Sequence, residues 1–170
     1  MDIRTEKPED YDSIYAVIKA AFDSAEHADG NEPDLVATLR KGENYIPELS
    51  LVAEENGKII GHIMFTKARV GQTIVLALAP LSVSPEYQRK GVGMALITEG
   101  HKIAKDLGYG YSVVLGSEKY YPRTGYVPAD TFGISAPFEV SRDNFMAYKI
   151  SENIPDVHGT MIYAKEFGIE

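Results

Sequence analysis

A strand, a glycine-containing turn and a helix follow one another between residues 73 and 106, and this succession constrains the fold most. Thr73–Val83 is rich in apolar and β-branched residues, which favours a strand. Helical spacing predicts a helix over Gly91–Asp106, ended by Gly108, and Tyr111–Leu115 is again strand-like. A strand, a helix and a strand in this order predict a locally parallel strand pair.

Two details of this unit can be predicted further. Pro80 lies inside the first strand and has no N–H to give to a sheet ladder. We therefore expect the strand to be bulged, or to lack a partner on one side, at that point. The buried face of the helix is predicted from its apolar residues, which are Met94, Ile97, Ala104 and Leu107.

The flanking sequence predicts a hairpin and two more helices. Asn56-Gly57 joins the strand-like runs Leu49–Glu54 and Lys58–Phe65, and Asn-Gly is typical of two-residue hairpin turns. Helices are predicted over Glu9–Phe22 and from Pro33 to Gly42. Further short strands are expected at Ile3–Arg4, Phe145–Ile150 and Thr160–Ala164. The sum is a mixed α/β fold.

Length and composition narrow the class of protein. A chain of 170 residues suits one domain, which we expect to span residues 1–170. The absence of cysteine excludes disulfides, a thiol nucleophile and zinc–thiolate sites, and the four scattered histidines predict no metal site. A net charge of −8 disfavours nucleic acid as a partner.

No apolar stretch approaches the roughly 18 residues that a membrane span needs, and the first residues lack a signal-peptide pattern. We therefore expect no membrane association and a cytoplasmic location. Strand edges and an apolar C-terminal segment are compatible with a homodimer.

The turn before the central helix suits an anion. Gly91 and Gly93 bracket the helix start, where main-chain N–H groups can face a ligand with no Cβ in the way. Arg89 and Lys90 add positive charge at the rim. A dinucleotide fingerprint is excluded because Leu96 replaces its third glycine, and a nucleotide P-loop sequence is absent. A tight turn without a ligand is the alternative interpretation.

Gln88, Gly91 and Gly93 match a Gln/Arg-x-x-Gly-x-Gly/Ala signature, and the sequence resembles the GNAT superfamily of N-acetyltransferases, in particular its YhbS-like branch. The resemblance extends over nearly the whole chain, through Val52–Ile63, Leu78–Gln88, Leu115–Tyr126 and Gly159–Phe167. It implies a mixed, mostly antiparallel central sheet with a splayed central strand pair, flanked by helices. It also implies transfer of the acetyl group of acetyl-CoA to an amine.

The resemblance implies how the cofactor is held. The main chain of Leu81, Ser82 and Val83 would pair with the pantetheine arm, and the N–H of Val83 would stabilise the thioester oxyanion. Pro80 supports this independently, because a strand that parts from its neighbour leaves unpaired donors. The residues expected at the pyrophosphate are Gln88, Arg89, Lys90, Gly91, Val92 and Gly93.

Tyr121 matches the tyrosine that in relatives protonates the departing thiolate, four residues before Gly125-Tyr126. A thiol and a phenol differ by about 1.5 pKa units, or roughly 2 kcal/mol, which a fixed hydrogen bond can offset. Tyr120 is the alternative donor, and a packing role for Tyr121 is the other interpretation.

A general base is harder to assign. Many relatives use a glutamate on the strand that here is Thr73–Val83, but this strand contains no acid. The remaining candidates are Glu32, Glu26, His27 and Glu54. Glu32 is preferred because its segment borders the acceptor site in relatives, while each candidate is equally compatible with a solvated charge.

Direct transfer in a ternary complex is expected, because the chain has neither a cysteine nor a Gly-x-Ser-x-Gly elbow. The missing strand acid motivates an alternative, a non-catalytic acyl-CoA-binding sensor. The expected acceptor is a small-molecule or peptide amine, and Phe132–Asn144 is expected to shape one wall of its site.

Overall fold

The computed structural model describes residues 1–23 and 30–169, and its centre is a nine-stranded sheet with the order β1-β2-β3-β4-β5-β8-β6. Strand β9 pairs with β3 and β7, and among the strand pairs of the described residues only β4–β5 and β7–β9 are parallel. The strands are β1 (Asp2–Thr5), β2 (Tyr45–Glu55), β3 (Lys58–Val70), β4 (Thr73–Val83), β5 (Tyr111–Leu115), β6 (Val127–Pro128), β7 (Ile134–Ser135), β8 (Phe145–Lys149) and β9 (Gly159–Ile162). The helices described are α1 (Tyr11–Asp23), α2 (Glu32–Arg40) and α3 (Val92–Asp106).

The expected fold class is confirmed: the sheet is mixed and mostly antiparallel, and the unit β4–α3–β5 gives its central parallel pair. The β2–β3 turn has φ of 53° at Asn56 and 78° at Gly57, both in the left-handed region that this hairpin requires. β3 runs to Val70, five residues beyond the expected end at Phe65, because β4 and β9 both pair with its second half.

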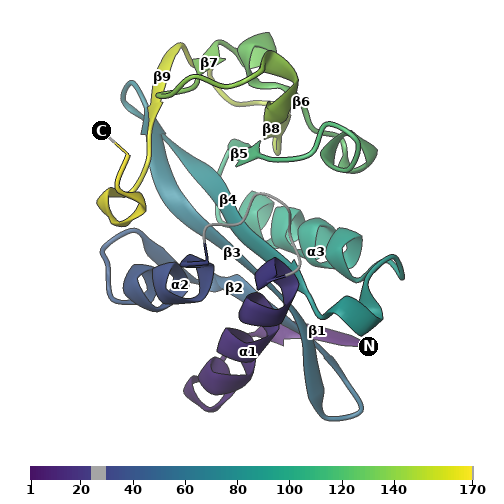
Figure 1. The fold of residues 1–170 in the computed structure, drawn as a ribbon. Coiled ribbons are helices and arrows are strands. Elements are labelled where there is room, and N and C mark those ends of the chain that lie inside the picture. The colour runs from purple at the N-terminus through teal and green to yellow at the C-terminus, as the bar shows by residue number, and fades with distance from the viewer. Residues whose placement is uncertain (24–29, 170) are drawn as a thin grey trace.

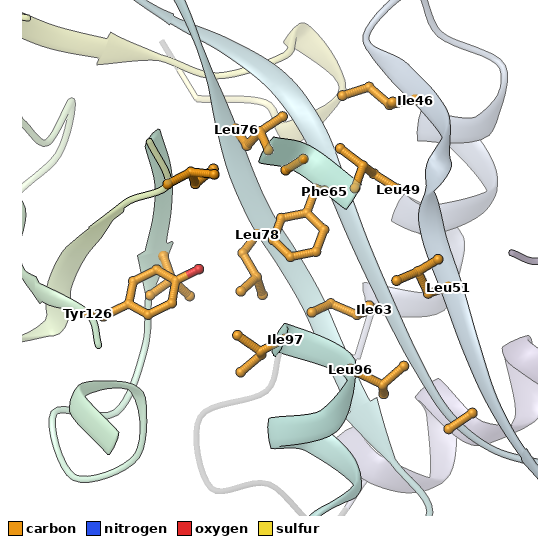
Figure 2. Close-up of a cluster of buried hydrophobic side chains, with 14 of the residues drawn as sticks. Ile46, Leu49, Leu51, Ile63, Phe65, Leu76, Leu78, Leu96, Ile97 and Tyr126 are labelled. Atoms are coloured by element: carbon orange, nitrogen blue, oxygen red, sulfur yellow. The ribbon is translucent and has the colours of Figure 1, made fainter. Parts of the chain in front are cut away.

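The helices cover both faces of the sheet (Figure 1). α1 and α2 pack over one face, where Ile14, Ile18 and Leu39 are buried against Val52 and Met64. α3 packs over the opposite face. Figure 2 shows its Leu96 and Ile97 beside a group of sheet side chains, namely Ile63, Phe65 and Leu78. None of the helices in the described parts of the chain is long and apolar enough to cross a bilayer.

The buried face of α3 differs from the expected one. Leu107 is 43% exposed and Met94 is only half-buried. Ile97 and Ala104 are buried as expected, and the other buried residues of the helix are Val92, Gly93, Leu96, Gly100 and His101. Gly100 explains the difference, because a Cβ there would collide with the ring of Phe65. The helix approaches the sheet most closely where its side chains are smallest.

A buried ion pair ties α2 to the first strand of the sheet. The guanidinium of Arg40, at the end of α2, donates to both carboxylate oxygens of Glu6 at 2.8 and 3.0 Å. The hydroxyl of Tyr45 and a ring nitrogen of His62 also contact this carboxylate, at 2.7 and 3.2 Å. These contacts lower the pKa of Glu6 despite its burial, so the carboxylate is charged and fixes the position of α2.

Candidate functional site

The two central strands part half-way along their length. β4 and β5 pair only at Leu76 with Ser112 and at Ala77 with Val113. Beyond these residues β4 continues to Val83 along β3 alone, and its register on β3 shifts between the pairs Phe65–Leu78 and Ile63–Leu81. The shift places two residues of β4, Ala79 and Pro80, opposite the single residue Met64 of β3, which is one extra residue in β4. The irregularity expected at the proline is therefore present where the strands separate.

Hydrogen bonding along β4 leaves a free edge facing the gap. The N–H of Ser84 donates to the carbonyl of Ile60 at 2.8 Å, and Ser82 lies opposite His62 in the same register. Because bonded and non-bonded pairs alternate in an antiparallel ladder, Ser82 and Ser84 turn their main chain toward β3. The main-chain groups of Leu81 and Val83 consequently point away from β3, into the gap left by β5.

The turn after β4 leads into an uncapped helix N-terminus. Arg89 and Gly91 have φ of 64° and 86°, so the chain turns sharply through the left-handed region before α3. The first main-chain hydrogen bond of the helix runs from the N–H of Ala95 to the carbonyl of Gly91. In the described part of the chain, the N–H groups of Val92, Gly93 and Met94 therefore have no main-chain acceptor, and no side chain caps them. Such a terminus attracts an anion.

A cavity of about 1100 Å³ opens at the gap. Its walls come from both faces of the sheet, because the ends of α1 and α2 contribute on one side and the start of α3 on the other. The lining residues are Ala21, Phe22, Asn31, Glu32, Leu35, Leu78, Ala79, Pro80, Leu81, Val83, Tyr87, Gln88, Arg89, Gly91, Val92, Gly93, Met94, Val114, Leu115, Gly116, Ser117, Lys119, Tyr120, Tyr121 and Arg123. The cavity therefore passes between β4 and β5, from the α3 side to the α1–α2 side.

Charge is unevenly distributed along this cavity. Three cationic side chains line it, Arg89, Lys119 and Arg123, although the whole chain carries a net charge of −8. Arg89 belongs to the turn before α3, and Arg123 to the segment that packs on the start of that helix. Glu32, at the opposite end, is the one acid among the described lining residues. The α3 side thus suits a polyanion and the α1–α2 side suits a cation.

Two adjacent tyrosines stand at the gap. The rings of Tyr120 and Tyr121 meet edge to face, with centroids 5.0 Å apart. A Cβ at Gly93 would collide with the hydroxyl of Tyr120, and a Cβ at Gly116 would collide with the ring of Tyr121. Tyr120 therefore reaches the helix N-terminus, whereas Tyr121 lies against the end of β5. Burial raises the pKa of both phenols, which keeps them protonated near neutral pH.

A buried polar cluster lies behind Tyr121. The hydroxyl of Tyr126 is 2.8 Å from Nε2 of His101 on α3 and 2.8 Å from Oγ of Ser112 on β5. The imidazole of His101 stacks on the ring of Tyr148, with centroids 4.1 Å apart and an interplanar angle of 3°. Burial lowers the pKa of His101 to about 4, so the imidazole is neutral at physiological pH.

The candidate bases fall into different places. Glu32, the first residue of α2, lines the same cavity as Tyr121. Glu54 does not: it pairs with Arg4 at 3.4 Å and lines a separate cavity under α1. Glu26 and His27 lie outside the described residues. Among the described candidates, only Glu32 shares the cavity with the expected cofactor residues.

Most of the expected cofactor residues line the cavity, and two do not. Leu81, Val83, Gln88, Arg89, Gly91, Val92 and Gly93 line it. Ser82 is buried and its main chain faces β3, so it offers nothing to the gap. Lys90 is exposed, and its Nζ lies 5.7 Å from the centroid of the Tyr87 ring. Phe132–Asn144 supplies no lining residue, since its aromatic side chains pack near β9. The segment therefore lies outside the lining of this cavity, and its place at an acceptor site stays a prediction.

Sequence reasoning missed part of the cationic wall and the apolar wall. Lys119 and Arg123 flank the Tyr120-Tyr121 pair, and their position beside a suspected site was the available signal. Phe22 and Leu35 lie at helix ends, where apolar residues are ordinarily attributed to the core. Nothing local in the sequence places these two residues at a cavity.

Comparison with known proteins decides the family. Residues 12–126 match the family model described as the Acetyltransferase (GNAT) family, which is more than half of the chain. The chain belongs to the GNAT family. Its signature residues Gln88, Gly91 and Gly93 therefore lie in the shared region, and the resemblance predicted from them is confirmed.

Three relatives of this GNAT chain are informative. It is 42% identical to the uncharacterized N-acetyltransferase YjhQ of Escherichia coli over 118 residues, which are 66% of this chain and 65%, just under two thirds, of YjhQ. The crystal structure of E. coli YhbS in complex with CoA superimposes with a TM-score of 0.88 at 27% identity, covering 98% of this chain and 91% of YhbS. The crystal structure of a GNAT family acetyltransferase from Brucella melitensis in complex with acetyl-CoA superimposes with a TM-score of 0.81 at 31% identity, covering 98% of this chain and 97% of the Brucella chain.

The buried histidine of this GNAT fold predicts an acid-dependent loss of stability. The unfolded chain binds a proton at His101 as the pH falls through about 6.5, whereas the folded chain does so only near 4. The free energy of unfolding should therefore decrease between these values by about 3 kcal/mol on account of this residue. Urea titrations of His101→Gln between pH 7 and 4 should show a correspondingly flatter dependence than the wild type.

The matched control is His158→Gln, which replaces an exposed histidine. It should follow the wild type at every pH. A His101→Gln protein that loses stability as steeply as the wild type would show that the imidazole is not neutral in the folded state.

Proposed function

We propose that this GNAT chain works as one domain that transfers the acetyl group of acetyl-CoA to an amine by direct attack in a ternary complex. The observation that carries the proposal is the cavity between β4 and β5, which is open to both faces of the sheet. A cofactor and an acceptor entering from opposite faces would meet in the gap. The relatives solved with CoA and acetyl-CoA support the choice of cofactor.

The cofactor would lie with its charged end on the α3 side. The free N–H groups at the start of α3, together with Arg89 and Arg123, would hold the phosphates. The pantetheine arm would then follow β4 away from the turn and reach Val83 before Leu81. Since residues two apart on a strand are about 6.6 Å apart, we assign Val83 to an amide of the arm and Leu81 to the thioester carbonyl.

This assignment replaces the expectation that the N–H of Val83 donates to the thioester carbonyl, and gives that role to Leu81. The carbonyl of Val83 already accepts a hydrogen bond from Nε2 of Gln88 at 3.0 Å. Gln88 thereby holds the last residue of β4 in place at the turn. The N–H of Leu81, one alternation further from the turn, is the donor that can stabilise the developing oxyanion.

The acceptor would enter between the ends of α1 and α2. Phe22 and Leu35 give an apolar surface there, and Glu32 gives a carboxylate. We assign Glu32 as the general base that takes the proton of the amine, directly or through a water molecule. β4 contains no acid, and this absence motivated the alternative of a non-catalytic acyl-CoA-binding sensor. Under the proposal, Glu32 supplies the base that β4 lacks.

The reaction forms a bond between the amine nitrogen and the acetyl carbon and breaks the bond between that carbon and sulfur. The amine proton goes to Glu32, and the leaving thiolate receives a hydrogen bond from the hydroxyl of Tyr121. Burial of Tyr121 widens the pKa gap between phenol and thiol. The hydrogen bond to sulfur is therefore the larger contribution during bond cleavage. As the CoA thiol departs, water restores the proton that Tyr121 gives to the thiolate, and Glu32 returns the amine proton to water.

Acetyl-CoA should stabilise the folded chain. A ligand present at 100 times its dissociation constant adds about 2.7 kcal/mol, which raises the melting temperature of a domain of this size by roughly 5–10 °C. NAD, which also carries a pyrophosphate and an adenosine, is the control and should give no comparable rise. An unchanged melting temperature at millimolar acetyl-CoA would contradict the proposed function.

Glu32→Gln should lower kcat/KM for amine acetylation by about 100-fold, because the amine loses its proton acceptor. Release of the CoA thiol can be followed with a thiol reagent, which reads only the coenzyme since the chain has no cysteine. The matched control is Asp34→Asn on the same helix, whose exposed carboxylate contacts the hydroxyl of Tyr15 and does not line the cavity. Equal rates for Glu32→Gln and Asp34→Asn would exclude Glu32 as the base.

A further inference from the structure

The ring of Tyr121 is held on three sides. Tyr120 meets it edge to face at 5.0 Å, and Gly116 leaves room for its face at the end of β5. On the third side lies the ring of Tyr126, whose centroid is 5.7 Å from that of Tyr121 at an interplanar angle of 71°. The main-chain N–H of Tyr126 also donates to the carbonyl of Tyr121 at 3.3 Å. Tyr126 contacts Tyr121 through both its ring and its main chain, and so helps to fix the position of Tyr121.

Tyr126 is itself fixed by its hydroxyl. This group is shared between His101 on α3 and Ser112 on β5, at 2.8 Å from each. Both partners are buried, and Ser112 lies opposite Tyr148 in the β5–β8 pair. Tyr148 in turn stacks on the imidazole of His101. One hydroxyl thus joins the segment that carries Tyr121 to α3 and to β5, and β5 forms one side of the gap.

We propose that the cluster of Tyr126, His101 and Ser112 is a positioning device that sets the hydroxyl of Tyr121 against the sulfur of the bound thioester. This inference rests on the proposed function, and it assigns a role to buried groups that the transfer reaction itself does not use. Neutral His101 can accept a hydrogen bond from the hydroxyl of Tyr126, which can in turn accept a hydrogen bond from the hydroxyl of Ser112. All three groups are then paired inside the core.

The cluster affects the rate because the hydroxyl of Tyr121 must be placed accurately against the sulfur of the leaving group. A displacement of about 1 Å in a catalytic group can cost as much as 100-fold in rate. Tyr126→Phe keeps the ring that contacts Tyr121 but removes the hydroxyl that anchors it. We expect this variant to lower kcat about 10-fold and to change the KM for acetyl-CoA by less than about 2-fold.

A double-mutant cycle separates positioning from general stabilisation. If Tyr126 acts through Tyr121, then Tyr126→Phe should lower kcat by less than about 2-fold in a Tyr121→Phe background. Tyr163→Phe is the control, since Tyr163 is a largely buried phenol that packs on Phe138 and Phe167, outside the cavity lining. It should leave kcat unchanged. All rates are compared below the lowest melting temperature of the set.

The outcomes distinguish the inference from the function on which it rests. An equal loss of kcat from Tyr126→Phe in both backgrounds, or no loss in either, would overturn the positioning role while leaving acetyl transfer in place. Unchanged kcat in Tyr121→Phe alone would instead remove Tyr121 as the proton donor. Should Tyr126→Phe not fold, Ser112→Ala deletes one of the two anchors, and its smaller loss should likewise vanish when Tyr121 is Phe.

Discussion

The separation of β4 from β5 after Ala77 and Val113 is the constraint on which the rest of the structure depends. Parallel strands normally satisfy each other's main-chain groups, and an unpaired edge inside a fold is costly. Here Ala79 and Pro80 shift the register of β4 on β3, and the main chain of Leu81 and Val83 turns toward the gap. The gap then becomes a cavity of about 1100 Å³ that opens on both faces. A strand-like cofactor arm is the kind of ligand that such an edge can pair with.

The elements around the gap each hold one group in place. The Arg40–Glu6 ion pair fixes α2, and α2 brings Glu32 to the cavity. The turn at Gly91 directs free N–H groups of α3 toward the same space. On the far side, the buried hydroxyl of Tyr126 joins α3 and β5 behind Tyr121. The proposed acid, the proposed base and the proposed anion site therefore come from separate parts of the chain that the sheet brings together.

Much of this was predictable from the sequence, because its signals are local. The Asn-Gly hairpin, the strand Thr73–Val83 and the helix that begins after Gly91 follow directly from turn chemistry and periodicity. The buried face of α3 was predicted only in part: Ile97 and Ala104 are buried as expected, but Gly93 and Gly100 also belong to this face, and hydrophobic periodicity does not count glycines. Their role is close approach to Tyr120 and Phe65, which is a property of packing partners. Ser82 and Lys90 were also expected at the cofactor, but they do not line the cavity, because strand alternation turns the main chain of Ser82 toward β3 and the side chain of Lys90 lies over Tyr87.

Amide hydrogen exchange measured by NMR on β4, with and without acetyl-CoA, tests the central claim most directly. The N–H groups of Leu81 and Val83 face the gap, whereas those of Ser82 and Ser84 face β3. Saturating acetyl-CoA should slow exchange at Leu81 and Val83 by about 10-fold or more and leave the two serines nearly unchanged. Exchange that stays equally fast at Leu81 and Val83 would contradict the account, since the cofactor arm would then not pair with this strand.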